Sequence, residues 1–269
     1  MKPNALQGPV PTARTPAPPG GRASPARAAA LPAQAGAGTA RPVGTVAVLV
    51  LADMHRSARL WAWARLVLGP RPFRGVAGLN FVKVMGSGAK GGFGLMPSGT
   101  HRGLFLAFDD EASARHFADH SPVLASWRAH ARELCVAVLR ASSSRGSWSG
   151  AALQPSVEAP LQGPVAALTR ASIRPHLALK FWRLSPAAEE SLVRAEGCLL
   201  AAGLGEAPLL RQCTFSLWSS ADAMDRYARS GAHQEAIRAA YGGGWFSESM
   251  FVRFVPLDIR GTWQGRSHG

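Results

Sequence analysis

One histidine stands apart as a candidate ligand for a metal or a cofactor. His233 begins a short predicted helix, residues 232–241, and Ile237 and Ala240 share its face. Because these neighbours are apolar, that face should point toward the protein core. An imidazole there either binds a metal or haem iron through one ring nitrogen or serves as a core histidine bonded to a backbone carbonyl. The residues alone leave both interpretations open.

Residues close to this helix could complete a cofactor pocket. Three aromatic side chains can form its apolar wall: Trp245, Phe246 and Phe251. Three arginines can pair with the propionates of a haem or remain in solvent: Arg226, Arg229 and Arg238. No residue type or spacing identifies a catalytic acid, base or nucleophile, so the catalytic residues stay unassigned.

The other histidines make weaker ligands. His116 and His120 have the helical spacing that places two imidazoles side by side, but Phe117 and its small neighbours form the apolar side of that helix. We therefore expect both imidazoles to face solvent. Three further histidines stand alone among arginines, and their sequence does not separate a surface position from the rim of a pocket: His55, His101 and His176.

The glycine-rich segment 86–94 resembles a dinucleotide motif only superficially. Gly86 to Gly91 matches the spacing G-x-G-x-x-G after a strand, yet more glycines and Pro97 follow where a helix should begin. We expect a turn or a loop that covers the substrate.

The three cysteines form no C-x-x-C pair and indicate reduced, buried thiols in a cytoplasmic protein. No cysteine lies in a glycine-rich thiolate loop, and no Gly-x-Ser-x-Gly elbow occurs.

Charge and hydropathy limit the partners. The chain carries a formal net charge of +14, of which +9 remains without the five basic residues of segment 1–43. That charge favours anionic lipid headgroups or an acidic protein, and no nucleic-acid-binding motif is present. The longest apolar run, Val43 to Ala52, is shorter than the roughly 20 residues needed to span a bilayer. We expect a cytoplasmic protein that contacts a membrane from one side.

Two matching blocks recur about 110 residues apart and indicate a duplication. Ser144 to Gly150 resembles Ile259 to Gly265, and 104–117 resembles 213–227. Each copy predicts the order strand, helix, strand, strand, helix, strand. The second copy includes helices at 177–184 and 187–194, and a capping box at Ser219-x-x-Asp222.

This order predicts an α+β fold of two ferredoxin-like units that pack as a fused dimeric α/β barrel around an apolar cavity. The expected domain boundaries are a disordered basic tail at 1–43, a first repeat at 44–150, a linker at 151–164, a second repeat at 165–265 and a tail at 266–269. The two copies differ at one notable position, where the first has Val123 and the second has His233.

The second copy also resembles a known family. The segments 231–238, 244–248 and 261–265 are similar to those of the spheroidene monooxygenases, the acyclic carotenoid 2-ketolases of purple photosynthetic bacteria. The resemblance extends over about residues 45–265. It implies an oxidoreductase of carotenoid biosynthesis that contains haem and uses O2 and reduced ferredoxin to oxidise carbon two of an acyclic methoxylated carotenoid.

The resemblance also implies roles for single residues. His233 would be the axial iron ligand, with Arg238, Trp245 and Phe246 around the haem, and the protein would lie at the surface of the photosynthetic inner membrane. Two alternatives remain: a haem or apolar-ligand carrier without activity, and a small-substrate oxygenase that needs no cofactor. Conversion of spheroidene and the presence or absence of a haem spectrum distinguish the three.

Overall fold

The computed structural model describes residues 40–269, apart from Leu95, Pro208 and Ser230. The side chains of Pro186, Ala188, Ala232 and His233 also lie outside the description. The predicted disordered tail therefore falls outside the described residues up to position 39.

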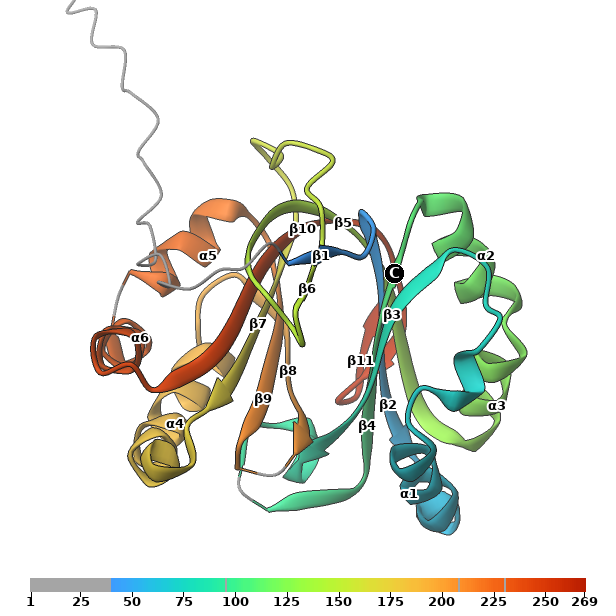
Figure 1. Cartoon of the computed structure of the whole chain (residues 1–269), viewed down its shortest axis with the longest axis horizontal. Helices are drawn as coiled ribbons and strands as arrows, with labels where there is room; N and C mark the ends of the chain where they lie inside the picture. The colour runs from blue at the N-terminus through green and yellow to red at the C-terminus, as the bar shows by residue number, and fades with distance from the viewer. Residues whose placement is uncertain (1–39, 95, 208, 230) are drawn as a thin grey trace, which may run out of the picture. The chain divides into compact units, whose positions relative to one another are not determined.

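Eight antiparallel strands close into a barrel (Figure 1). The order around the barrel is β10, β5, β2, β4, β3, β8, β9, β7 and back to β10. The strands are β2 (Val46–Met54), β3 (Leu79–Gly88), β4 (Pro97–Phe108), β5 (Ala131–Gly146), β7 (Val165–Ile173), β8 (Cys198–Ala207), β9 (Arg211–Trp218) and β10 (Phe246–Trp263). Closure pairs the strand edges that an open sheet would leave exposed. A mixed α/β barrel is thus confirmed.

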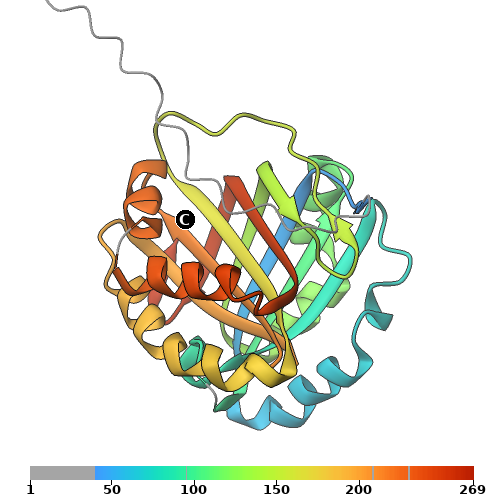
Figure 2. The same cartoon turned by 60° about the vertical axis from the view of Figure 1, so that its left-hand side comes forward.

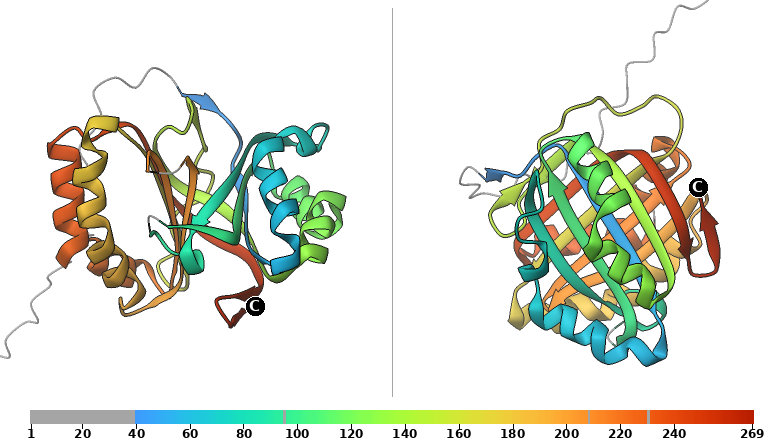
Figure 3. Two further views of the ribbon diagram at one scale, coloured as in Figure 1. Left: turned by 90° about the horizontal axis from the view of Figure 1, so that it is seen from below. Right: turned by 90° about the vertical axis from the view of Figure 1, so that its right-hand side faces the viewer.

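The helices cover the outside of the barrel, with those of the two halves on opposite flanks (Figure 3). The first half carries α1 (Arg59–Leu68), α2 (Glu111–His120) and α3 (Pro122–His130), and the second carries α4 (Ala178–Val193), α5 (Ala221–Ala228) and α6 (Gly231–Gly242). Within each half the fourth strand lies beside the first, followed by the third and the second. Both halves thus share one strand order, and their origin by duplication stays a prediction.

Short strands occupy three segments that the sequence assigned to tails and a linker. β1 (Arg41–Pro42) pairs in parallel with β6 (Ala151–Ala152), and β11 (Arg266–His268) pairs with the end of β10. Val43 is buried next to β1. Ordered structure therefore includes the last residues of the predicted tail and the start of the predicted linker.

Several elements differ from the predicted ones. A further helix, α3, begins directly after α2, because the Ser121 hydroxyl accepts a hydrogen bond from the Leu124 amide and proline suits a first helical position. α4 joins the two predicted helices and continues through Pro186. The cap of α5 is Ser220 rather than Ser219, since the Ser220 hydroxyl accepts from the Ala223 amide.

The barrel interior is filled by apolar side chains from both halves. Residues alternate between the two faces of a strand, so Ala166 and Leu168 of β7 point inward with Phe215 of β9. Val165 and Ala167, one residue out of phase, pack on the outer face beneath helices of the second half. Any cavity on that outer face is therefore separate from the interior.

Candidate functional site

A pocket of ≈ 130 Å³ lies between the second half of the barrel and its helices α4 and α6. Thr169 and Ala171 of β7 and Thr214 of β9 form its floor. These residues alternate with the inward-facing Leu168, Cys213 and Phe215, so they belong to the outer face of the sheet. The sequence predicted a cavity enclosed by the barrel, but this pocket lies on the outer face of the sheet. Core side chains fill the neighbouring interior.

The walls of the pocket are mainly apolar and come from the two helices and the start of β10. Figure 2 shows α6 and α4 crossing the face of these strands side by side. The apolar wall residues are Phe181, Leu184, Leu192, Ala236, Ile237, Ala240, Trp245 and Phe246. The Phe246 ring meets the rings of Phe181 and Tyr241 edge to face, with centroids 6.1 and 5.5 Å away. These contacts fix the aromatic side of the pocket.

The floor of the pocket carries two polar residues where the first half of the barrel has apolar ones. In the first half, Val50 of β2 pairs with Leu104 of β4, and both are fully buried beneath the helices. In the second half the corresponding pair is Thr169 and Thr214. Threonine matches valine in size but is smaller than leucine, so Thr214 leaves space below α4 and α6 where Leu104 fills the first half. The two halves are therefore alike in backbone register but differ at this floor.

Polar contacts close the pocket at its edges. The Phe93 amide donates to Glu189 Oε1 of α4 at 2.8 Å, which holds the glycine-rich segment against the helix. The Tyr241 and Ser249 hydroxyl oxygens lie 3.2 Å apart. The site is thus an apolar recess with a few fixed hydrogen-bonding groups, a composition typical of small-molecule sites.

The structure brings two of the predicted site residues to this pocket. Trp245 and Phe246 both line it, whereas Arg238 is exposed on α6 and does not. His233 lies in α6, but its side chain is outside the described residues, so its role stays a prediction. Its neighbours along the helix face, Ile237 and Ala240, do line the pocket.

Other candidates are engaged elsewhere. Phe251 packs in the cluster around Trp218, and Arg229 pairs with Asp225. His116 and His120 are exposed on α2, with their rings stacked, as predicted. His55 and His176 are exposed, while His101 on β4 is hydrogen-bonded to Ser98 and its ring contacts Trp263.

Burial favours the protonated thiol form of the three cysteines. Burial raises the pKa of Cys135 to about 12 and that of Cys198 to about 11, and it also raises the pKa of Cys213. All three are free thiols. Among the described residues, no three His, Cys, Asp or Glu side chains come together as a metal site.

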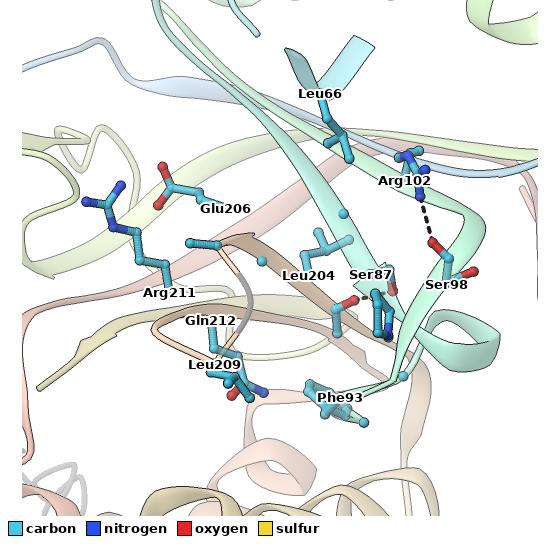
Figure 4. Close-up of a pocket in the computed structure, with 18 of the residues that line it drawn as sticks. Leu66, Ser87, Phe93, Ser98, Arg102, Leu204, Glu206, Leu209, Arg211 and Gln212 are labelled. Carbon is cyan, nitrogen blue, oxygen red and sulfur yellow. Dashed lines mark hydrogen bonds between the residues drawn. The ribbon is translucent and has the colours of Figure 1, made fainter. Parts of the chain in front are cut away.

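Sequence reasoning missed both the α4 wall and a second, larger cavity. The sequence signal for the pocket between α4 and α6, hereafter the α6 pocket, was the threonine on the helix-facing side of each of two neighbouring strands, Thr169 and Thr214. The larger cavity, ≈ 350 Å³, adjoins the glycine-rich segment and shares Phe93 and Gln212 with the α6 pocket (Figure 4). There β3 extends to Gly88 and the loop is shorter than predicted.

Comparison with known proteins identifies the family. The chain is 54% identical over 84% of its length to spheroidene monooxygenase of Rubrivivax gelatinosus, of which it covers 88%. The chain belongs to the spheroidene monooxygenase family. It is also 39% identical over 77% of its length to the spheroidene monooxygenase of Rhodobacter capsulatus, covering 87% of that protein. No family model matches the chain.

Solved structures place this spheroidene monooxygenase family member in a wider fold group. A crystal structure of an aldoxime dehydratase in complex with butyraldoxime superposes with a TM-score of 0.53 at 12% identity, covering 80% of this chain and 79% of that one. A second aldoxime dehydratase gives a TM-score of 0.52. At this identity the likeness concerns the fold alone. In the described part of the chain, no helix has the length and hydropathy to cross a membrane.

Proposed function

We propose that this chain is a haem-dependent monooxygenase that oxidises carbon two of an acyclic methoxylated carotenoid with O2 and reduced ferredoxin. The identity of 54% to a spheroidene monooxygenase over most of both chains carries the proposal. Each hydroxylation consumes one O2, two electrons and two protons and releases one water. A second hydroxylation at the same carbon gives a diol, which loses water to form the ketone.

The pocket between α4 and α6 is the proposed haem site. Its walls suit a flat apolar macrocycle in chemistry, since Phe181, Trp245 and Phe246 present aromatic surface. Its ≈ 130 Å³ is below the roughly 300–1,000 Å³ typical of sites for small molecules, so binding requires α4 and α6 to separate. His233, from α6, would be the iron ligand.

The residues of this chain would hold the cofactor and keep water away. Activation of O2 for attack on a C–H bond is the chemistry that a bound haem supplies. Leu192 and Ile237 exclude water from the pocket, which strengthens the polar contacts that remain. The Tyr241 and Ser249 hydroxyls provide the fixed hydrogen-bonding groups nearest that wall. Arg238, exposed on the same helix, is free to approach a propionate.

The surface supports contact with a membrane and an acidic electron donor. Helix α1 exposes Leu60 and Val67, which are 85% and 81% accessible, beside the exposed Arg56 and Arg59. Apolar side chains flanked by arginines suit an interface with anionic lipid. The net charge of +14 also suits an acidic ferredoxin.

Duplication of a ferredoxin-like unit is the proposed origin of the barrel. The support is the shared strand order of the two halves and the equivalent register of the Val50–Leu104 and Thr169–Thr214 pairs. In this view the second half kept or gained the pocket, while the first half completes the barrel on which the second half packs.

An absorption spectrum and a turnover assay test the function together. Purified protein reconstituted with haem should show a Soret band and, with reduced ferredoxin and O2, convert spheroidene to its 2-keto product. His233→Ala should remove the band while the far-UV circular dichroism is retained, and His176→Ala should leave the band unchanged. A normal band in His233→Ala would show that another residue binds the iron. Turnover without a band would favour the cofactor-free oxygenase, and a band without turnover the carrier.

A further inference from the structure

The larger cavity lies where the two halves of the barrel meet. Residues of α1, β3, the start of β4 and the β8–β9 turn surround its ≈ 350 Å³ (Figure 4). This volume falls in the roughly 300–1,000 Å³ range of small-molecule sites. The joining strands β3 and β8 pair through only two residues each, Gly86 with Gly205 and Ser87 with Leu204.

Glycines allow the backbones to approach closely at this junction. A Cβ atom on Gly203 would lie 2.4 Å from the Gly92 carbonyl oxygen, and one on Gly88 would lie 2.6 Å from the same oxygen. Side chains at these positions would therefore force the glycine-rich segment away from β8. The glycine-rich segment and β8 thus lie in direct backbone contact, and the side chains that line the cavity come from the elements around them.

Two of the three charged side chains that line the cavity, Arg102 and Glu206, are bound by the protein, and the third, Arg211, is exposed to solvent. The Arg102 guanidinium donates to the carbonyl oxygens of Ala62, Ser98, Gly99 and His101, at 2.7 to 3.3 Å. Glu206 is held by Lys83 at 2.7 Å, the Trp148 indole and Arg170. Groups engaged in this way offer little to a polar ligand.

Most of the other large side chains that line the cavity are apolar. Leu66 and Val84 line the cavity, and Trp63, Val67 and Leu209 lie at its exposed side, with accessibilities of 45%, 81% and 48%. At the inner end, Phe93 and Gln212 separate the cavity from the α6 pocket, because both residues line both spaces. The cavity thus lies between an apolar surface and the proposed reaction site, with Phe93 and Gln212 as the shared wall.

We infer that this cavity binds the chain of a long, apolar, conjugated polyene, whose end reaches the α6 pocket past Phe93. The inference rests on the proposed function for the identity of the substrate. The apolar side chains of the walls, the bound Arg102 and Glu206, and the shared Phe93 support the binding site itself.

A binding assay with all-trans-retinol, a neutral polyene that accepts energy from tryptophan, tests this assignment in the full chain without haem or turnover. Retinol should quench tryptophan emission, and Trp63→Phe should remove more of the quenching than Trp245→Phe. Val67→Glu should weaken binding by about tenfold, since it places a carboxylate at the mouth. Val193→Glu is the matched control, because Val193 is 66% accessible on α4 and lines neither cavity.

A second variant, Leu66→Trp, should abolish binding by filling the cavity, with circular dichroism confirming the fold. Binding that is unchanged in both Val67→Glu and Leu66→Trp would overturn the inference, as would quenching that depends on Trp245 instead of Trp63. Equal losses in Val67→Glu and Val193→Glu would also overturn it. Retinol binding without spheroidene turnover would refute the proposed function alone, and turnover that is unaffected by Leu66→Trp would refute the polyene site alone.

Discussion

Two threonines distinguish the second half of the barrel from the first. Thr169 and Thr214 lie where Val50 and Leu104 complete the packing of the other half. Thr214→Leu should reduce the pocket and lower haem retention severalfold, while the melting temperature stays the same or rises, since the added methyl groups enter existing space. Soret absorbance per protein after reconstitution measures the effect. Thr214→Val, which keeps the size, should retain haem; equal retention by the leucine variant would argue against this pocket.

His101 makes the stability of the protein depend on pH. Burial lowers its pKa below 6.5, although the Asp53 carboxylate 3.6 Å away acts in the opposite direction. The unfolded chain therefore binds the proton more readily, and the stability that neutral His101 contributes is full above pH 6.5 and is lost as the pH falls through the folded-state pKa. Urea midpoints at about pH 7.5 and 5.5 should differ more in the wild type than in His101→Asn. The same pH dependence in both proteins would contradict this assignment.

At the scale of elements, helix capping decides where α5 begins. The Ser220 hydroxyl accepts from the Ala223 amide at 3.2 Å, and Ser219 lies one residue earlier. Ser220→Ala should lower the free energy of unfolding by about 1 kcal/mol, measured by urea denaturation. Ser219→Ala should change it by less than about 0.5 kcal/mol. A larger loss of unfolding free energy in Ser219→Ala than in Ser220→Ala would show that Ser219 is the cap, as the sequence pattern predicted.

The periodicity of the sequence was enough to predict the element order but not several ends. Val165–Ile173 matches its prediction, because an apolar run between turn residues indicates a buried strand. α4 crosses Pro186, since packing on the sheet and α6 outweighs the missing amide. β10 is long because it pairs with β7 up to Phe254 and with β5 up to Gly261, and such long-range pairing leaves no local signal. Trp245 and Phe246 could be predicted because they follow the His233 helix closely in the sequence. Phe181 and Leu192 on α4 could not, because only the tertiary fold brings them to the pocket.

At the scale of the whole molecule, the two halves depend on one another. β10 pairs with β5 of the first half from Met250 to Gly261, and the interior core joins side chains of all eight strands. Neither 40–157 nor 158–269 should fold alone, because each would expose its inner face. The intact chain should unfold in one transition, with equal calorimetric and van't Hoff enthalpies. A separate half with dispersed NMR signals would disprove this dependence.

The barrel has one long seam and one short one. β5 and β10 are joined over most of their length, whereas β3 and β8 meet only at Gly86 and Ser87. Local opening of the barrel should therefore occur first at the short seam, where few hydrogen bonds join the strands. Amide protons there should exchange with deuterium faster than those in the long seam. The barrel can then widen there for a bulky guest while the opposite side keeps its shape.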